Sequence, residues 1–322
     1  MKSEFEFIEN IRKRYSLTKI GDDCAVLPKD SKTDLVITTD LLIEGVDFKL
    51  EWSKPEFIGH KSLAVSLSDV AAMGAKPVWA MLSIGIPQKI WKTDFVERFY
   101  NGYFRLAQKF DVEIVGGDVS RTPDKIVIDS IAAGEVKKGK AVLRSGAKAG
   151  DLVFVTGNLG GAAGGLKLLQ DGVQYNFSEK IWRKRLLLKQ LQPFPQTPDG
   201  EFLLESKISS MIDLSDGLSS DLAHICRESK VGAKIYASKI PIDKNLRGLT
   251  KSFDEKLSYA LNGGEDFELL FTVNPKKYFE AENEFKKRGF SHIGEMTANT
   301  EIIELITNEN MQILQSKGFR HF

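Results

Sequence analysis

The feature that most constrains the fold of this chain is the alternation of short apolar runs with longer amphipathic segments. In the first half, apolar runs of strand length occupy residues 34–39, 78–86 and 125–136. Segments 57–73 and 94–110 lie between them, and their apolar side chains recur at the spacing of a helix. This order, with some strands placed to pair as hairpins, predicts α+β domains rather than a doubly wound parallel sheet.

The second half repeats this mixture after a change in composition. Residues 137–150 are rich in Gly, Lys and Ala and contain few large apolar side chains, which is typical of a connection between domains. Beyond it we predict strands at 152–156, 211–212, 268–273 and 302–306, and helices at 181–191, 215–229 and 275–288. We therefore expect an N-terminal domain at residues 1–138 and a C-terminal α+β domain at residues 139–322.

The charge balance argues against some classes of partner. The 322 residues include 45 basic and 44 acidic side chains, which gives no electrostatic reason to expect nucleic acid or an anionic membrane as partner. No stretch approaches the roughly 20 apolar residues of a membrane span, and residues 1–10 resemble neither a signal peptide nor a transit peptide. Cys24 and Cys226 are far apart and the histidines are scattered, so we expect a reducing cytoplasm and no disulfide framework or zinc site.

Carboxylates beside Gly, Ser or Thr are the main chemical signal, and most of them follow an apolar run. These residues are Asp22, Asp23, Asp40, Asp69, Asp118, Asp213, Asp216, Glu265 and Asp266. A carboxylate at a strand end is held by the sheet but still reaches a cleft, and hard cations such as Mg²⁺ prefer oxygen ligands. Neighbouring glycines let backbone N–H groups approach a phosphate. Together these features predict a site for metal-bound phosphates.

Each motif alone also has a local explanation. An Asp beside Gly is common in turns, which would account for Asp118 after Gly116-Gly117, and Asp213 or Ser215 would suit the cap of the helix that follows. The whole set is harder to explain by turns, because converging carboxylates repel one another and need a cation. Neither a Walker A pattern nor the protein-kinase signature set occurs, so bound ATP would be held mainly by metals and backbone amides.

Taken in order, these motifs resemble the thiamine-monophosphate kinase family over nearly the whole chain. In the first half the matching segments are 21–25 (GDDCA), 38–40 (TTD) with 44–45 (EG), 61–74 (KSLAVSLSDVAAMG), 116–118 (GGD) and 144–146 (RSG). In the second half they are 155–157 (VTG), 212–218 (IDLSDGL), 263–269 (GGEDFEL) and the ending 318–322 (GFRHF). Each segment is weak evidence alone, but the ordered combination is specific.

The resemblance implies a fold and a reaction. The family shares a superfamily with aminoimidazole ribonucleotide synthetase and selenophosphate synthetase. This implies an N-terminal α/β domain for ATP, metal binding and dimerisation, and a C-terminal α+β domain that completes the active site. The implied reaction transfers the γ-phosphate of ATP to thiamine monophosphate, giving thiamine diphosphate and ADP. The implied cofactors are several Mg²⁺ ions, with K⁺ as a candidate monovalent ion, and the implied assembly is a cytoplasmic homodimer.

The resemblance also assigns the family's site residues to the positions of this chain that match its motifs. The implied metal ligands are Asp23, Thr38, Thr39, Asp40, Asp69, Asp118, Asp213 and Asp216. The implied ATP contacts are Gly117, Asp118, Arg144 and Ser215, and those to thiamine phosphate are Asp47, Glu265 and Phe319. Arg144 is the candidate catalytic cation that follows the transferring charge.

Two positions depart from the family pattern. Asp47 stands where the family usually has His, so a hydrogen-bond donor has become a negatively charged acceptor, and Ser66 stands where Asn is more usual. All the carboxylates of the metal set are present. Phosphoryl transfer is therefore better supported by the sequence than the identity of the acceptor.

The chemistry leaves two alternatives open. Phosphoryl transfer requires positioning and charge neutralisation more than covalent chemistry, and an acceptor phosphate is already ionised near neutral pH because its second pKa is about 6, so we assign no general base. One alternative is a sister enzyme that activates an amide or carboxylate with ATP, which activity on formylglycinamidine ribonucleotide or selenide would indicate. The other is a nucleotide-binding protein without activity, which would consume no ATP with or without thiamine monophosphate.

Overall fold

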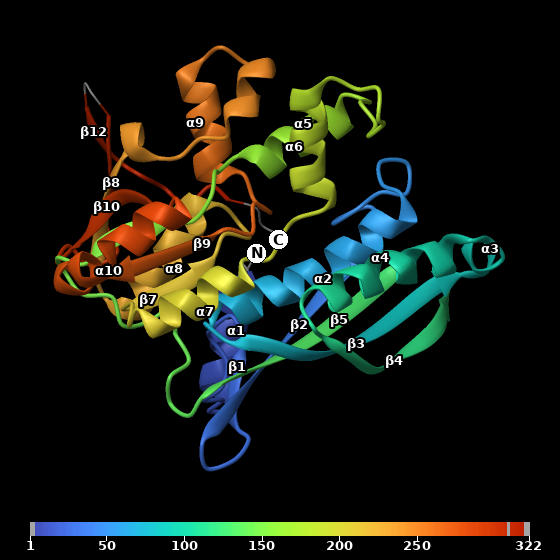
Figure 1. Ribbon diagram of the computed structural model, residues 1–322, viewed down its shortest axis with the longest axis horizontal. Helices are drawn as coiled ribbons and strands as arrows, with labels where there is room; N and C mark the ends of the chain where they lie inside the picture. Colours follow the sequence, from blue (N-terminus) through green and yellow to red (C-terminus); the bar gives the residue numbers. More distant parts are fainter. Residues whose placement is uncertain (1–3, 308–309, 319–322) are drawn as a thin grey trace.

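Two mixed β-sheets organise the chain in the computed structural model, which describes residues 4–307 and 310–318 (Figure 1). The first sheet has the strand order β1-β2-β5-β3-β4. Its strands are β1 (Ala25–Pro28), β2 (Thr33–Ile43), β3 (Lys76–Pro87), β4 (Glu113–Thr122) and β5 (Val127–Lys137). All neighbours are antiparallel except β3 and β4. The predicted α+β class is confirmed.

Among the helices of the first half, α2 (Pro55–Ala72) covers one face of this sheet and α4 (Phe95–Lys109) packs beside it. The other helices are α1 (Glu4–Arg14) and α3 (Gln88–Trp91). α2 packs on β2, β5 and α4 and is buried on nearly every side, which is the pattern of a central helix. The opposite face of the sheet carries no helix among the described residues (Figure 1). We call it the open face, defined by Ile37, Leu41, Trp79, Met81 and Ile131, all partly or fully exposed.

Strand pairing extends through two of the sequence motifs, at residues 38–40 and 116–118. β2 continues through Asp40 to Ile43 because all of its residues pair with β5, from Thr33 opposite Lys137 to Ile43 opposite Val127. β4 includes Gly116–Asp118, so this motif is part of a strand and not a turn. Gly117 has a φ of 154°, and a Cβ there would lie 1.8 Å from the carbonyl oxygen of Leu82 on β3. Close strand packing therefore explains this glycine.

The second sheet has the strand order β12-β11-β8-β10-β6-β9-β7. Its strands are β6 (Leu152–Val155), β7 (Ser210–Asp213), β8 (Gly232–Tyr236), β9 (Leu269–Val273), β10 (Ser291–Thr297), β11 (Ile303–Ile306) and β12 (Met311–Ile313). Residues 138–151, which precede it, form no helix or strand.

Helices cover both faces of this second sheet. The helices of this half are α5 (Gly161–Gln170), α6 (Ile181–Leu191), α7 (Thr197–Glu205), α8 (Leu218–Ser229), α9 (Phe253–Asn262) and α10 (Pro275–Arg288), with short 3₁₀ turns at Ala237–Lys239 and Lys244–Gly248. Of these, α8 and α10 lie on opposite faces of the sheet, whereas α5 and α6 pack on each other in a separate cluster. Alternate residues of β6 face different cores. Val153 and Val155 pack with Leu222 of α8, whereas Phe154 packs with Phe285 of α10. Every residue of β9 is buried, as expected for a strand covered on both faces.

The central helix α2 connects the two halves. Its last residues, Ala71 and Ala72, belong to the same buried cluster as Phe154 and Leu269 of the second sheet. Phe267, just before β9, belongs to the core of the first half. No helix within the described ranges is long and apolar enough to cross a membrane.

Candidate functional site

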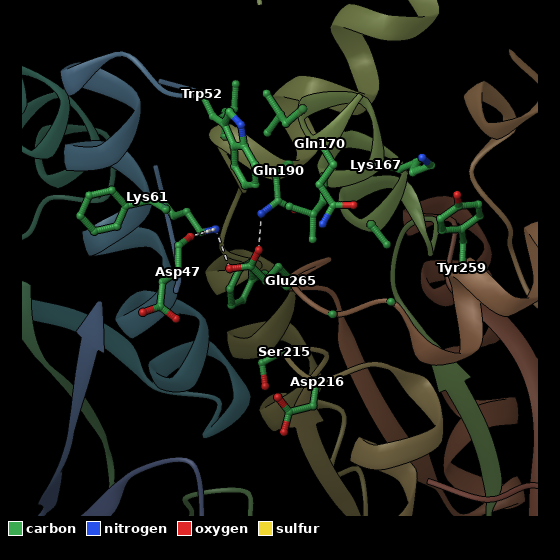
Figure 2. A pocket seen from close by; sticks show the side chains of 18 of the residues that line it. Asp47, Trp52, Lys61, Lys167, Gln170, Gln190, Ser215, Asp216, Tyr259 and Glu265 are labelled. Carbon is green, nitrogen blue, oxygen red and sulfur yellow. Dashed lines mark hydrogen bonds and ion pairs between the residues drawn. The ribbon is translucent and has the colours of Figure 1, made fainter. Parts of the chain in front are cut away.

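A cleft of about 1040 Å³ lies between the two halves of the chain (Figure 2). One wall comes from β2, the loop that follows it and α2, and the other from α5, α6, α9 and the loops at 215–216 and 263–267. The cleft contains aromatic surface from Trp52 and Tyr259 and a buried ammonium group from Lys61. Its size is at the upper end of ordinary ligand cavities.

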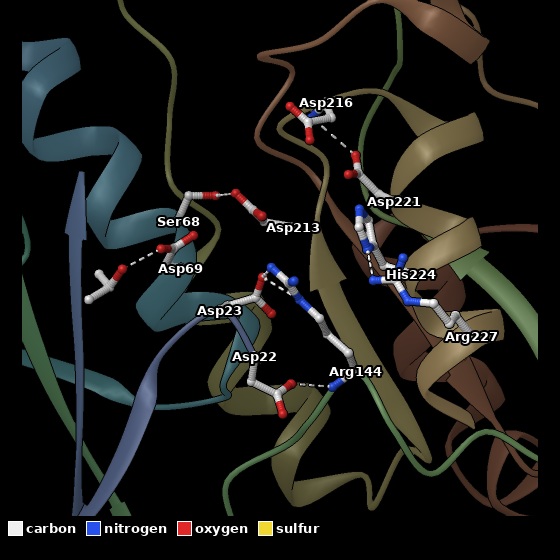
Figure 3. A network of polar contacts seen from close by, with 11 residues as sticks. Asp22, Asp23, Ser68, Asp69, Arg144, Asp213, Asp216, Asp221, His224 and Arg227 are labelled. Carbon is white, nitrogen blue, oxygen red and sulfur yellow. Dashed lines mark hydrogen bonds and ion pairs between the residues drawn. The ribbon is translucent and has the colours of Figure 1, made fainter. Parts of the chain in front are cut away.

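Three aspartates that are distant in sequence meet beside this cleft (Figure 3). Asp23 precedes β1, Asp69 lies near the end of α2, and Asp213 ends β7. One carboxylate oxygen from each lies within 4.8 Å of the others. We call these residues the aspartate cluster. The sequence placed all three among the metal ligands, and the fold brings them together.

Hydroxyl groups and a guanidinium orient the cluster. Thr38 Oγ1 donates to Asp69 at 2.5 Å, and Ser68 Oγ donates to Asp213 at 2.7 Å. Arg144 donates to one oxygen of Asp23 through both Nε and Nη2, at 3.1 and 2.6 Å. The other oxygen of Asp23 is buried and has no hydrogen-bond partner among the residues that the structure describes. An orphaned acceptor in such a place is rare in proteins and indicates a missing partner.

The raised pKa values in the cluster reflect burial of its carboxylates and the repulsion between them. Burial raises the pKa of Asp213 to about 8, and the negative charge of Asp23 adds to this effect. Burial also holds the pKa of Asp69 well above its usual range, with further contributions from Asp40 and Asp213. A bound cation would offset this repulsion and supply the partner that Asp23 lacks. The three carboxylates thus fit a hard, oxygen-binding metal ion.

Asp40 joins the cluster from the neighbouring strand. Its side chain lies on the α2 side of β2, where it accepts a hydrogen bond from Ser66 Oγ at 2.7 Å. Burial raises the pKa of Asp40 to about 6. The same hydroxyl lies 3.0 Å from the carbonyl oxygen of Ser130, so its one hydrogen is shared between Asp40 and β5 and ties both to α2. The small hydroxyl at this departure from the family pattern therefore has a defined structural role.

Thr39 and Asp118 lie on the open face of the first sheet, away from the aspartate cluster. Thr39 alternates with Thr38 along β2 and donates to Asp129 at 2.6 Å. Asp118 is exposed and lies in one row of the sheet with Ser83 and Asp129. Within one chain, these two predicted ligands are thus on the other side of the strands from Thr38 and Asp40.

The loop that carries Ser215 and Asp216 lines the cleft beyond Asp213. Asp221, in the first turn of α8, holds this loop by accepting hydrogen bonds from the backbone N–H groups of Asp216 and Gly217 at 3.3 and 3.0 Å. The residue at the helix cap is Gly217. Neither Asp213 nor Ser215 is therefore the cap, which removes the local explanation for both.

The GGEDFEL segment divides its acidic residues between two roles. Glu265 faces the cleft, where it forms an ion pair with Lys61 at 2.5 Å and accepts a hydrogen bond from Gln190 (Figure 2). Asp266 accepts hydrogen bonds from the backbone N–H groups of Gly160 and Ala162 at the start of α5. Glu268 is buried and binds Lys189 of α6 at 2.8 Å. The last two fix the helices that form the cleft wall.

Asp47 closes a loop at the edge of the cleft. Its carboxylate accepts a hydrogen bond from the backbone N–H of Ile43 at 2.7 Å, and its carbonyl oxygen accepts one from Lys61 Nζ at 3.3 Å. A hydrogen-bond acceptor at position 47 therefore holds this loop closed. Asp47 still lines the cleft, whereas the other predicted thiamine contact, Phe319, lies outside the described residues.

Several side chains of the site carried no signal that a single sequence could reveal. Ser68 and Lys61 lie within the segment 61–74, but nothing in the segment assigned them a contact. Gln190 and Asp221 lie in ordinary helical sequence. Only the packing of α2, α6 and α8 around the cleft brings these residues to the site.

Comparisons with known proteins agree over the length of the chain. The N-terminal domain model of the AIR synthase related proteins matches residues 21–136, and the C-terminal domain model matches residues 148–306. The thiamine-monophosphate kinase of Buchnera aphidicola (subsp. Acyrthosiphon pisum) is 39% identical and the alignment covers 99% of each chain. That of Escherichia coli K12 is 38% identical, with 94% of this chain and 91% of the relative covered. A solved structure, "AaThiL complexed with AMPPCP and TMP", has a TM-score of 0.87 at 33% identity, with 99% of this chain and 97% of that chain covered.

Proposed function

Because this chain belongs to the thiamine-monophosphate kinase family of AIR synthase related proteins, we propose that it transfers the γ-phosphate of ATP to thiamine monophosphate. The products are thiamine diphosphate and ADP. The observation that carries this proposal is the aspartate cluster with its orphaned Asp23 oxygen, next to a cleft that joins both halves of the chain. The cluster suits metal-bound phosphates and the cleft suits an extended organic acceptor.

Mg²⁺ is the proposed metal, because the available ligands are carboxylate and hydroxyl oxygens. Asp23, Asp69 and Asp213 would hold it, with Thr38, Asp40 and Asp216 around them. The ion would neutralise phosphate charge that these carboxylates otherwise repel. Thr39 and Asp118 would bind metal from the open face. K⁺ is a further proposed ion, which activity in matched K⁺ and Na⁺ buffers would test.

The chain's own residues position the reacting groups. Arg144 is fixed by Asp23, and its backbone N–H donates to Asp22 at 2.6 Å, so its guanidinium is held beside the cluster. There it stabilises the charge that moves with the transferring phosphoryl group. Ser215, Gly117 and Asp118 contact ATP, and Asp47, Glu265 and Phe319 contact thiamine monophosphate. The acceptor phosphate attacks directly and in line, since it needs no base to ionise it.

The proposed assembly is a homodimer formed through the open face. On this face, the five apolar side chains that define it are only partly buried within one chain, and Leu41 is 57% exposed. A contiguous apolar surface of this kind indicates a protein partner. Thr39 and Asp118 lie on the same face, so a second copy would bring its own residues close to them. The proposed domain boundary remains at residues 138 and 139, and the proposed location is the cytoplasm.

The deciding experiment incubates the purified protein with ATP, Mg²⁺ and thiamine monophosphate, beside samples with free thiamine or without acceptor. We expect thiamine diphosphate from the monophosphate alone, measured by chromatography. ATP binding without any diphosphate product would refute the acceptor. ATP made chiral at its γ-phosphorus with oxygen isotopes would test the in-line step, because one direct transfer inverts the configuration and a phosphoenzyme intermediate would retain it.

A further inference from the structure

Gln190, in the lining of the cleft, has a buried acceptor that is unpaired among the residues the structure describes. Its side chain lies near the end of α6, is 5% exposed and forms part of the cleft lining. In the part of the chain that the structure describes, its amide oxygen Oε1 is buried and accepts no hydrogen bond. Buried polar atoms are nearly always paired. An orphaned acceptor in the wall of a ligand cleft indicates that the bound ligand supplies the donor.

The orientation of this amide is fixed by its neighbour. Gln190 Nε2 donates to Oε2 of Glu265, and a flipped amide would instead place an oxygen against the carboxylate (Figure 2). Oε1 of Glu265 is held from the other wall of the cleft by Lys61, at 2.5 Å. Glu265 also has a backbone φ of 66°. The carboxylate and the orphaned amide oxygen thus form a fixed pair of acceptors.

This pair lies away from the aspartate cluster. Lys61 and Asp69 are eight residues apart on α2 (69 minus 61), which is about 12 Å along a helix axis at about 1.5 Å per residue. A ligand whose phosphate reaches the cluster must extend along α2 before it reaches Glu265 and Gln190. Thiamine monophosphate has this shape, because its phosphate is joined by a short arm to a thiazolium ring and then to an aminopyrimidine.

We propose that Gln190 binds the substrate through Oε1, which accepts a hydrogen bond from the exocyclic amine of the aminopyrimidine ring. This inference rests on the proposed function, which supplies the aminopyrimidine. The amine offers two N–H donors to the two acceptors, whereas the thiazolium ring has no N–H group to offer. Gln190 would then make the enzyme specific for the amino form of the ring.

The test compares two substrates in the wild type and in Gln190→Met, which keeps the length of the side chain and removes the amide. The substrates are thiamine monophosphate and the analogue in which hydrogen replaces the amine. We expect the wild type to favour the amine about 10- to 100-fold in kcat/KM, since a site built to bind a donor rejects the analogue that lacks it. In Gln190→Met this preference should fall at least about 3-fold without vanishing, because Glu265 still accepts from the amine, and the change should come through KM more than kcat.

Two further variants make the result decisive. Gln170→Met changes an exposed glutamine of the same cleft and should keep the full preference. Gln190→Asn retains an amide but withdraws the oxygen by one carbon, so it should show the same reduced preference, and it decides the question if Gln190→Met fails to fold. An undiminished preference in a folded position-190 variant would overturn the role of Gln190 alone. No diphosphate from the wild type would overturn the proposed function and this inference with it.

Discussion

Asp213→Asn should make the metal-free protein more stable at neutral pH while it abolishes turnover. The pKa of Asp213 is raised from 3.8 to about 8, by burial first and then by Asp23. A carboxyl that holds its proton more tightly in the folded state favours folding at low pH, and this contribution is lost as the pH rises. Between about pH 4 and pH 8, the metal-free wild type should therefore lose stability.

The magnitude follows from the size of the pKa shift. A difference of about four units, from 3.8 to about 8, gives a ceiling of roughly 6 kcal/mol at about 1.4 kcal/mol per unit. We expect about 2 kcal/mol, because neighbouring carboxyls share the titration and water enters a metal-free site. The asparagine amide carries no charge and still accepts the hydrogen bond from Ser68. The free energy of unfolding of Asp213→Asn should thus fall less steeply with pH than that of the wild type, and the remaining slope should come from Asp40 and Asp69.

Thermal denaturation in EDTA from pH 5.5 to 8.5 measures this effect. At pH 8 the variant should melt a few degrees above the wild type, whereas Mg²⁺ should raise the melting temperature of the wild type and have less effect on the variant. Turnover of ATP should fall by about 100-fold or more. Asp124→Asn removes the same charge from an exposed turn and serves as the control. A flat wild-type profile, or a variant less stable than the wild type at pH 8, would refute the reasoning.

Three further changes test other parts of the structure. Arg144→Lys should lower kcat about 100-fold with little change in melting temperature, because a single ammonium cannot replace two guanidinium donors on Asp23; unchanged steady-state kinetics would exclude Arg144 from catalysis. Gly117→Ala should lower the free energy of unfolding by about 3 kcal/mol in urea denaturation, since its Cβ would meet the carbonyl oxygen of Leu82, whereas Gly116→Ala has open space and should cost less than about 1 kcal/mol. Leu41→Glu should shift a dimer toward monomers in sedimentation, and Phe279→Glu, at an exposed site on α10, should not; a Leu41→Glu dimer of unchanged affinity would place the interface elsewhere.

Local signals predicted the elements of the fold well where their chemistry was unambiguous. The helix predicted at 275–288 agrees with α10 at both ends, because Pro275 begins it and Gly289 follows in a left-handed conformation. The strand predicted at 34–39 was too short, since the extension to Ile43 depends on pairing with β5 ninety residues later, as between Leu41 and Asp129. Gly116–Asp118 was ambiguous for a similar reason. The strand that contains it pairs with β3, and no neighbouring residue in the sequence indicates that pairing.

The candidate site likewise has features that sequence neighbours predict and features that depend on contacts between distant parts of the chain. The carboxylates could be selected from their neighbours in the sequence. The strand predicted at 34–39 placed Thr38 and Thr39 on opposite faces, but the sequence did not show which of these faces would pack on α2. It also did not show the pairing of Arg144 with Asp23, which lie 121 residues apart. Among the described residues, the oxygen of Gln190 is left unpaired where α2, α6 and the loop at 263–267 meet at Glu265. The metal, ATP and thiamine contacts of the individual residues remain predictions.

The position of α2 constrains how ligands enter and leave. This one helix carries Lys61 at the cleft and Asp69 at the cluster, and its end is embedded in the core under the second sheet. Rotating the two halves apart would pull Ala71 and Ala72 out of that core and move Asp69 away from Asp213. A hinge motion that opens the cleft would therefore separate the residues of the aspartate cluster in every catalytic cycle. Exchange of substrate and product should instead depend on the loop at 44–54, so the rate of release should respond to mutations there and hardly at all to mutations at the exposed residues 138–140.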